Sequence, residues 1–128
     1  MDNTAIARGL FDALAQGDDD GVRALCAPEF QLRQNGGHPM NLASLLRFNR
    51  HVQRVVTGFR YEEVVCDATA TGFVEEHAVR GTLPCGLPLA LAACIVGDVQ
   101  DGKVTMVREY VDTAAAAPML ALLAAARQ

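Results

Sequence analysis

Glu109 is the residue whose setting in this sequence points most directly to chemistry. It lies in the segment VTMVREYVDT, residues 104–113, which follows a DG turn and has the composition of a β-strand. Alternate side chains of a strand point to opposite faces, so Glu109 shares a face with Val107 and Val111. If that face lines an apolar cavity, desolvation raises the pKa of the carboxyl group and makes it a candidate general acid or base near neutral pH.

Two other placements of Glu109 are open from the sequence alone. The carboxylate can pair with an arginine, for which Arg33 and Arg80 are available, and its role is then structural. The strand face can also point to solvent, and the neighbouring valines then carry no information. Only the position of the strand in the fold distinguishes the three.

Three helices are predicted in the first half of the chain. The first carries apolar residues at helical spacing and ends at Gly17. A short second helix is capped by Asp18 and ends at Pro28, and a short strand, EFQLRQN, follows it. The third helix begins at the cap residue Asn41 and ends at Gly58, with an apolar stripe along one side.

From residue 59 onward the hydrophobic period changes from helical to two. Four strands are predicted, FRYEEVVCDATA, FVEEHAVRGTL, LALAACIVGDVQ and KVTMVREYVD, and short turns join them, which makes successive strands antiparallel. The Ala/Leu-rich segment after residue 113 predicts a final helix. The sequence therefore predicts a single α+β domain over residues 1–128: a curved antiparallel sheet forming a cone closed by three N-terminal helices, plus a short C-terminal helix.

Composition and missing motifs narrow the classes of function. The formal net charge is −4 with a single lysine, which does not suit a nucleic-acid-binding protein. No apolar run reaches the roughly 18 residues of a membrane span, and the N-terminus lacks the features of a signal peptide, so we expect a cytoplasmic protein. Nucleotide-binding loops, metal-ligand spacing and a serine-hydrolase motif are not found either, and we expect neither a cofactor nor a metal.

Three segments of the chain resemble the SnoaL-like, nuclear transport factor 2-like superfamily. The segment DGKVTMVREYVD is similar to that family's closing pattern DGKI…W-R-E-Y-F-D. Upstream, EEHAVRGTLPCGLPLAL resembles its middle hairpin and LFDALAQGDDDGVRALCAPEF its opening helix pair. The resemblance implies an α+β cone with a deep pocket, commonly dimeric through the outer sheet face. Members include polyketide cyclases, ketosteroid isomerases and limonene-1,2-epoxide hydrolases.

The resemblance also implies roles for particular residues. Glu109 matches the closing-strand acid that helps activate a water in the epoxide hydrolases, and Asn35 matches a water-holding asparagine. Glu76 falls where those enzymes place an arginine, and Ala78 falls where they place an acidic partner. Because Ala78 interrupts that set, epoxide hydrolysis by this arrangement is not expected.

The same alignment points Glu76 and Arg80 into the cavity and His77 to the outer face. Two carboxyl groups in one cavity do not both ionise readily, so Glu76 and Glu109 would divide into an acid and a base. Such a pair suits proton abstraction next to a carbonyl group or acid-assisted ring chemistry. Arg80 could instead neutralise one of the two carboxylates and leave a salt bridge without chemistry.

The resulting hypothesis is a SnoaL-like protein that binds a small, partly apolar molecule and acts as an isomerase, cyclase or hydrolase. Its expected catalytic residues are Glu109 and Glu76. Its expected substrate-binding residues are Arg33, Asn35, His38 and Arg80. We expect a homodimer through the outer sheet face as well as the small-molecule ligand. The alternative is a ligand-binding or dimerisation module without catalysis, in which Glu109 forms a structural ion pair.

Overall fold

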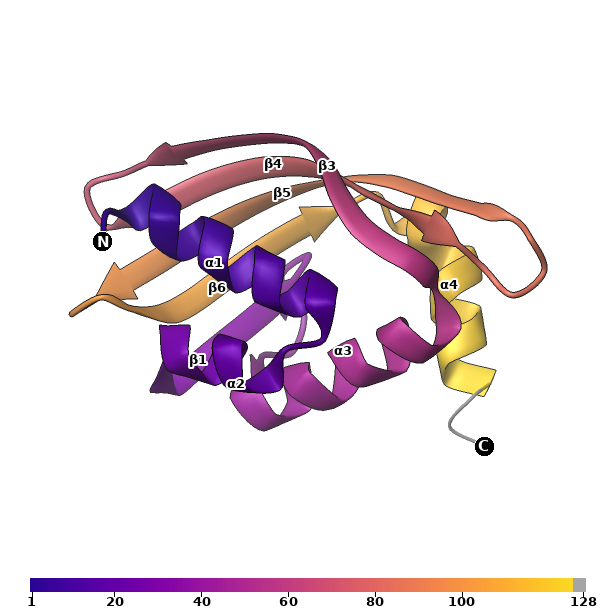
Figure 1. Ribbon diagram of the computed structural model, residues 1–128, viewed down its shortest axis with the longest axis horizontal. Coiled ribbons are helices and arrows are strands. Elements are labelled where there is room, and N and C mark those ends of the chain that lie inside the picture. The colour runs from indigo at the N-terminus through magenta and orange to yellow at the C-terminus, as the bar shows by residue number, and fades with distance from the viewer. Residues whose placement is uncertain (126–128) are drawn as a thin grey trace.

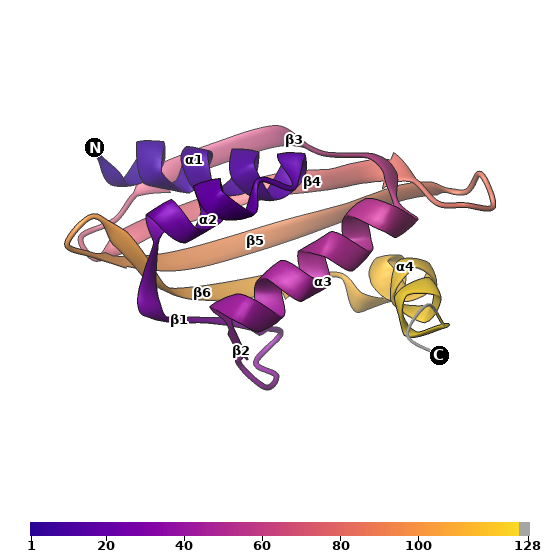
Figure 2. The ribbon, with the colours of Figure 1, turned by 60° about the horizontal axis from the view of Figure 1, so that its bottom comes forward.

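A strongly curved β-sheet packs against helices on its concave side (Figures 1 and 2). The computed structural model describes residues 1–125. The helices are α1 (Asn3–Gln16), α2 (Asp19–Leu25), α3 (Leu42–Val55) and α4 (Thr113–Ala125). The strands are β1 (Cys26–Gln34), β2 (Met40–Asn41), β3 (Thr57–Ala68), β4 (Gly72–Thr82), β5 (Pro88–Gln100) and β6 (Lys103–Val111). This arrangement confirms the predicted α+β cone with its three N-terminal helices and its C-terminal helix.

The order of the strands in the sheet is β2-β1-β6-β5-β4-β3, and the sheet does not close. Strands β3 to β6 form the predicted antiparallel meander. Strand β1 pairs parallel with β6, so the sheet is mixed rather than wholly antiparallel. Short turns determine the direction of consecutive strands only, and β1 and β6 are separated by most of the chain.

The starts of α2 and α3 and the end of α1 lie where the local sequence predicts them, whereas α2 and α3 end at Leu25 and Val55, before the predicted Pro28 and Gly58. Asp18 accepts a hydrogen bond from the backbone N–H of Gly21 at the start of α2, and Asn41 does the same from Ser44 at the start of α3. Gly17 ends α1 in the left-handed conformation, with φ of 68°. These side-chain and glycine caps satisfy backbone groups that have no partner within the helix.

Phe73 forms the centre of the core where α1 crosses the sheet. Its side chain is fully buried, and its partner on the neighbouring strand is Gly97. A Cβ atom on Gly97 would lie 2.2 Å from Cζ of Phe73, so only glycine lets the ring lie flat against β5. This contact identifies the face of β4 that carries Phe73 as the inner face.

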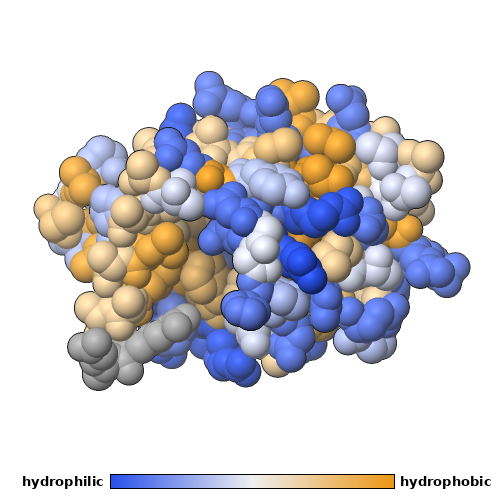
Figure 3. Space-filling view, turned by 180° about the vertical axis from the view of Figure 1, so that it is seen from behind, coloured by the Kyte–Doolittle hydropathy of each residue, from blue (hydrophilic) through white to orange (hydrophobic). Residues whose placement is uncertain are grey.

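Helix α4 packs across the end of the sheet away from α1. Ala116, Met119 and Leu123 are buried in a second core cluster with Leu89 and Leu91. The exposed side of α4 is also rich in alanine and leucine, and apolar side chains gather at this end of the molecule in Figure 3. Among residues 1–125, no helix has the length and apolar character needed to cross a membrane.

Candidate functional site

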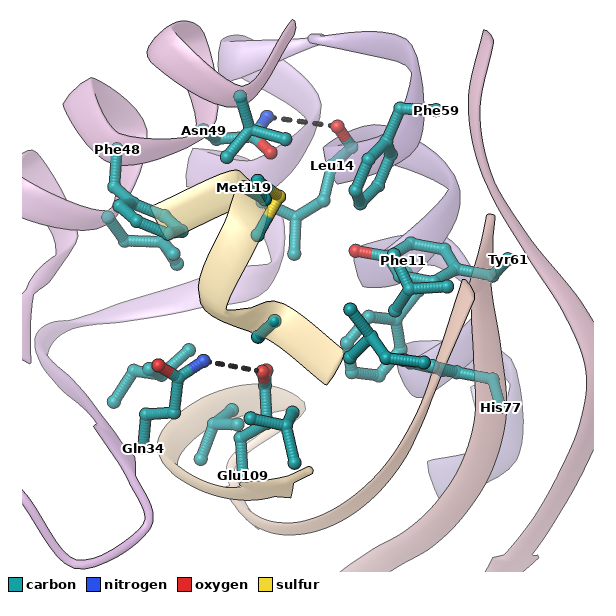
Figure 4. A pocket seen from close by; sticks show the side chains of 18 of the residues that line it. Phe11, Leu14, Gln34, Phe48, Asn49, Phe59, Tyr61, His77, Glu109 and Met119 are labelled. Atoms are coloured by element: carbon teal, nitrogen blue, oxygen red, sulfur yellow. Dashed lines mark hydrogen bonds between the residues drawn. The ribbon is translucent and has the colours of Figure 1, made fainter. Parts of the chain in front are cut away.

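A mostly apolar cavity lies between the inner face of the sheet and helices α1, α3 and α4 (Figure 4). Its volume is about 90 Å³. Aromatic and aliphatic side chains from every layer of the fold line it, among them Phe11, Phe30, Phe48, Phe59, Val52, Leu91, Val107 and Met119. The side chains of the lining that carry polar groups are Gln34, Asn49, Tyr61, His77 and Glu109. A few polar groups in an apolar cavity are the usual composition of a small-molecule site.

Glu109 lies on the cavity wall, as the alternation of β6 predicts, together with Val107 and Val111. The side-chain amide of Gln34 donates a hydrogen bond of 3.0 Å to Oε1 of Glu109 (Figure 4). The two residues are paired across the parallel strands β1 and β6. Glu109 is enclosed by protein, and the part of its surface that stays accessible faces the cavity.

Burial raises the pKa of the Glu109 carboxyl above its ordinary value, because an apolar surrounding disfavours the charged form. The hydrogen bond from Gln34 and the nearby His77 lower the pKa in part, without cancelling the effect of burial. Within residues 1–125, Glu109 takes part in no ion pair. Of the three placements open from the sequence, the structure has the carboxyl in an apolar cavity.

The prediction that Glu76 and Arg80 point into the cavity is wrong. Both lie on the outer face of β4, where Glu76 is exposed and Arg80 lies 3.5 Å from the Glu63 carboxylate. The inner face of β4 is set by burial of its bulkiest apolar side chains, Phe73 and Val79. Glu76 and Glu109 therefore do not share a cavity, and the expected pair of carboxyl groups does not form.

The three residues expected at the cavity mouth do not line the cavity. Arg33 is exposed, on the opposite face of β1 from Gln34, and His38 is exposed on the loop between β1 and β2. Asn35 joins β1 to the end of β6: its side chain accepts a 3.0 Å hydrogen bond from the Val111 N–H and donates one to the Val111 carbonyl. Asn35 therefore helps to hold the strand that carries Glu109.

The residues that take the inner positions of β4 are Glu75 and His77. Nδ1 of His77 lies 2.7 Å from Oε2 of Glu75, and both residues are almost completely buried. The prediction that His77 lies on the outer face is wrong, because it is one residue out of register. The signal that finds the correct face is the size of the flanking apolar residues, because Phe73 and Val79 have the same parity as Glu75 and His77.

Tyr61 closes the cavity wall next to His77. Its ring centroid lies 4.3 Å from that of His77 and 5.5 Å from that of Phe11. Burial raises the pKa of the Tyr61 hydroxyl, and the carboxylates of Glu109 and Glu75 raise it further. The hydroxyl points into the cavity in Figure 4, where it is a neutral hydrogen-bond donor. A shift in register after Glu62, with Glu63 at φ of 54°, gives β3 the bulge that follows Tyr61.

Thiolate and metal chemistry have little support in the described residues. Burial, with a contribution from the Glu75 carboxylate, raises the pKa of the Cys66 thiol to about 11. Burial raises the pKa of Cys26 to about 12. Within residues 1–125, no group of three or more histidine, cysteine, aspartate and glutamate side chains is arranged to hold a metal ion.

The fold and the site define a class of protein: an α+β cone whose inner face holds ionisable side chains in an apolar cavity. The SnoaL-like domain model matches residues 7–107, most of the chain, and the chain therefore belongs to the SnoaL-like family. Among proteins with curated functions, none matches the chain.

Solved structures show the same fold at low sequence identity. IdmH, a candidate polyketide cyclase from Streptomyces antibioticus, is 19% identical with a TM-score of 0.79, over 94% of this chain and 99% of that one. A candidate polyketide cyclase from Xanthomonas campestris pv. campestris is 22% identical with a TM-score of 0.78, over 88% and 91%. An LEH-like epoxide hydrolase from M. tuberculosis is 21% identical with a TM-score of 0.69, over 86% and 82%. The likeness establishes the NTF2-like cone, and function must be argued from the site.

Proposed function

We propose that this SnoaL-like protein binds a small, largely apolar molecule in the cavity and catalyses proton transfer on it, with Glu109 as general acid and base. The observation that carries this proposal is the carboxyl of Glu109, which faces an apolar cavity and is held by a neutral amide rather than by a cation. A carboxyl group with a raised pKa takes up and releases protons closer to neutral pH, where general acid–base catalysis is most effective.

The hydrogen-bonding pattern leaves one oxygen of Glu109 free for a substrate. Gln34 occupies Oε1, and Oε2 has no hydrogen bond within residues 1–125. Glu62 Oε2 and Glu75 Oε1 are the buried polar side-chain atoms without a partner in that part of the chain, so Oε2 of Glu109 retains contact with the cavity. A fixed carboxylate with one accessible oxygen is the geometry that a proton-abstracting base requires.

An isomerase or a cyclase agrees better with the site than an epoxide hydrolase. Hydrolysis of the kind implied by the resemblance needs an acid–arginine–acid set, but the inner positions of β4 hold Glu75 and His77, and Arg80 lies on the outer face. Proton abstraction next to a carbonyl needs one base and one donor to the oxygen. Glu109 supplies the base, and Tyr61 and His77 lie on the same cavity wall as candidate donors. Two relatives of the same fold are described as candidate cyclases, in agreement with this choice.

The experiment is exchange of α-protons for deuterium in D₂O, followed by NMR with a series of apolar ketones from cyclopentanone to 2-tetralone. The wild-type protein should accelerate exchange for the smaller ketones first, because the cavity is small. Glu109→Gln should reduce the acceleration by about 10²- to 10⁴-fold. Glu76→Gln is the matched control: it makes the same substitution on the outer face and should leave the rate unchanged. Acceleration that survives in Glu109→Gln would mean that the base is another residue. Saturable ketone binding without any acceleration would favour the binding module.

A second copy of the chain is the partner that we propose for the outer sheet face. Val65 and Tyr110 are large apolar side chains on this face and are 57% and 50% exposed. They flank a shallow groove that also contains Ala92 and Cys94. Light scattering over a dilution series should give the mass of a dimer for the wild type and a lower mass for Tyr110→Glu. A wild-type mass of one chain at every concentration would exclude this assembly.

A further inference from the structure

His77 is a second ionisable residue on the cavity wall, and it is hydrogen-bonded to the buried Glu75 behind it. Glu75 is 1% exposed and His77 is 4% exposed, and Oε2 of Glu75 is 2.7 Å from Nδ1 of His77. Phe11 packs edge-on against the imidazole ring at 5.1 Å, and Tyr61 covers it at 4.3 Å. The ring is therefore fixed both by packing on its faces and by a hydrogen bond at one nitrogen.

The hydrogen bond determines what the other nitrogen of His77 can do. With Glu75 as the acceptor, Nδ1 is the donor of this hydrogen bond, and Nε2 is the ring nitrogen left for a bound molecule. Nε2 makes no hydrogen bond within residues 1–125 and is not among the two buried polar atoms that lack a partner there. Nε2 therefore keeps some accessible surface, and His77 is one of the residues that line the cavity. The pair therefore presents one exchangeable proton position to a bound molecule.

The arrangement is costly for a purely structural element. Burying a carboxylate and an imidazole costs more than burying apolar side chains of similar size, unless all their polar atoms are satisfied. Oε1 of Glu75 is buried without a hydrogen bond. The same positions filled by apolar residues would continue the Phe73 and Val79 side of β4 into the core. A role for the imidazole in proton transfer would explain why the fold retains this energetically costly pair.

The positions of His77 and Glu109 suit two ends of one small substrate. They lie on β4 and β6, which are separated by β5, and the register offsets them by two residues along the strands, so their backbones are roughly 12 Å apart. Their side chains both point into the concave face, and the residue that pairs with His77 on β5 is the small Ala93. The electrostatic influence of His77 on the carboxyl of Glu109 also indicates that the two groups are near each other.

We propose that His77, oriented by Glu75, is the second proton-transfer group of the cavity and works with Glu109 on an enolisable apolar carbonyl compound. This inference rests on the proposed function. The Glu109 carboxylate takes a proton from the carbon next to the carbonyl, and the C–H electron pair forms the C=C bond. The C=O π pair moves to the oxygen, which receives the proton from Nε2 of His77 and becomes the enol hydroxyl. Where a further C=C bond is conjugated with the enol, Glu109 returns its proton to the far carbon of that bond, the hydroxyl proton returns to Nε2, and the carbonyl re-forms, which gives an isomer without oxidant or reductant. In this scheme Glu75 is a positioning residue.

The first test is the pH profile of ketone α-proton exchange, with cyclohexanone as the probe. Wild-type exchange should decline at low pH, where Glu109 is protonated. His77→Gln should lower the rate by about 10²-fold or more. Glu75→Gln should keep the cavity and lower kcat more than it raises KM, because it changes the partner of Nδ1. His38→Gln, the same change on an exposed loop, is the control and should do neither.

The second test does not depend on a variant that must fold. ¹⁵N–¹H correlation spectra of wild-type protein should show His77 with a proton on Nδ1, and addition of cyclohexanone should shift Nε2 of His77 without shifting the nitrogens of His38 or His51. An unmoved Nε2 would overturn the inference. Exchange that depends on Glu109 but proceeds at the full rate in His77→Gln would overturn the inference and leave the proposed function intact. Absence of exchange with every ketone in the wild type would overturn the proposed function and the inference with it.

Discussion

The inner and outer faces of β6 place carboxyl groups in opposite environments, one that lowers the pKa and one that raises it. On the outer face Arg108 donates two hydrogen bonds, of 2.9 and 3.1 Å, to the carboxylate of Asp98 on β5. These bonds hold the pKa of Asp98 below its ordinary value. On the inner face, one residue further along, burial raises the pKa of Glu109, and within residues 1–125 the amide of Gln34 is the hydrogen-bond donor to its carboxylate.

The difference shows what each carboxyl group contributes to the stability of the folded state. Asp98 is stabilised as an anion, at a partly exposed surface where the pair costs little and contributes little. Glu109 is kept in a place that disfavours its charge, which raises its pKa. The outer pair favours the folded state, whereas the inner carboxyl lowers stability when it is ionised.

Placing a cation beside Glu109 should remove most of the difference between the carboxyl groups of Glu109 and Asp98. Gln34→Lys places an ammonium group where the amide now donates to Oε1. We expect the pKa of Glu109 to fall, because an adjacent positive charge favours the anion, and ketone exchange to slow by about tenfold or more. Gln31→Lys, on the exposed side of the same strand, is the matched control. Undiminished exchange in Gln34→Lys would show that the missing cation is unimportant.

The two carboxyl groups should give opposite dependences of stability on pH. The folded state of Glu109 binds its proton more tightly than the unfolded chain, so its contribution is present below pH 4.5 and is lost as the pH rises through the raised folded value. Each unit by which the folded-state pKa of Glu109 exceeds its unfolded value lowers the free energy of unfolding by about 1.4 kcal/mol at pH values above both. Glu109→Gln should therefore gain stability relative to wild type between acidic and neutral pH in urea titrations. A constant difference between the two proteins across that range would contradict a raised pKa.

Removing only the hydrogen bond from Gln34 should increase the difference in pKa between Glu109 and Asp98, by a smaller amount. In Gln34→Leu the donor that lowers the pKa of Glu109 is gone, and burial acts unopposed by it. We expect the pKa to rise further and the low-pH decline of exchange to move to higher pH. ¹³C NMR titration of the Glu109 carboxyl carbon measures the change directly. A lower pKa in Gln34→Leu would mean that solvent replaces the amide.

Breaking the Arg108–Asp98 pair on the outer face should have the smallest effect on the protein. Asp98→Asn should cost about 0.2–1 kcal/mol of unfolding free energy, and less in high salt, because both partners are about one-third exposed. The contribution is present above pH 3.8 and is lost as the pH falls through the lowered folded value of Asp98. Thermal unfolding at two salt concentrations measures it. Exchange activity should not change, and a loss of activity would connect the outer face to the site.

Part of the site could be predicted from the sequence because it depends on local pattern. Val107, Glu109 and Val111 share a parity in a strand that a DG turn delimits, which made a cavity carboxyl one of three placements, and the fold selected it. The alternation predicted for β4 gave the wrong face. Both faces of that strand carry two apolar residues, Phe73 and Val79 on one and Val74 and Ala78 on the other, so alternation alone did not distinguish them.

The prediction that Arg33, Asn35 and His38 lie at the cavity mouth was wrong for a different reason. Arg33 and His38 are close in sequence to Gln34, but a strand directs neighbours to opposite faces and a loop carries His38 away. Asn35 has a positive φ of 51° and uses its side chain on the backbone of β6. No local signal indicates such a contact, because its partner, Val111, is distant in the sequence.

The sequence by itself determined the main helices and strands of this protein, the helix caps, the antiparallel meander and the shared strand face of Val107, Glu109 and Val111, because each depends on residues that are near one another in the chain. The tertiary structure alone decided that β1 lies parallel beside β6 and brings Gln34 to Glu109. It also decided that β4 turns Glu75 and His77 inward, because Phe73 finds room against Gly97 on a strand that the chain reaches only after a turn. Pairing and packing between distant segments are cooperative, and no short stretch of sequence carries that information.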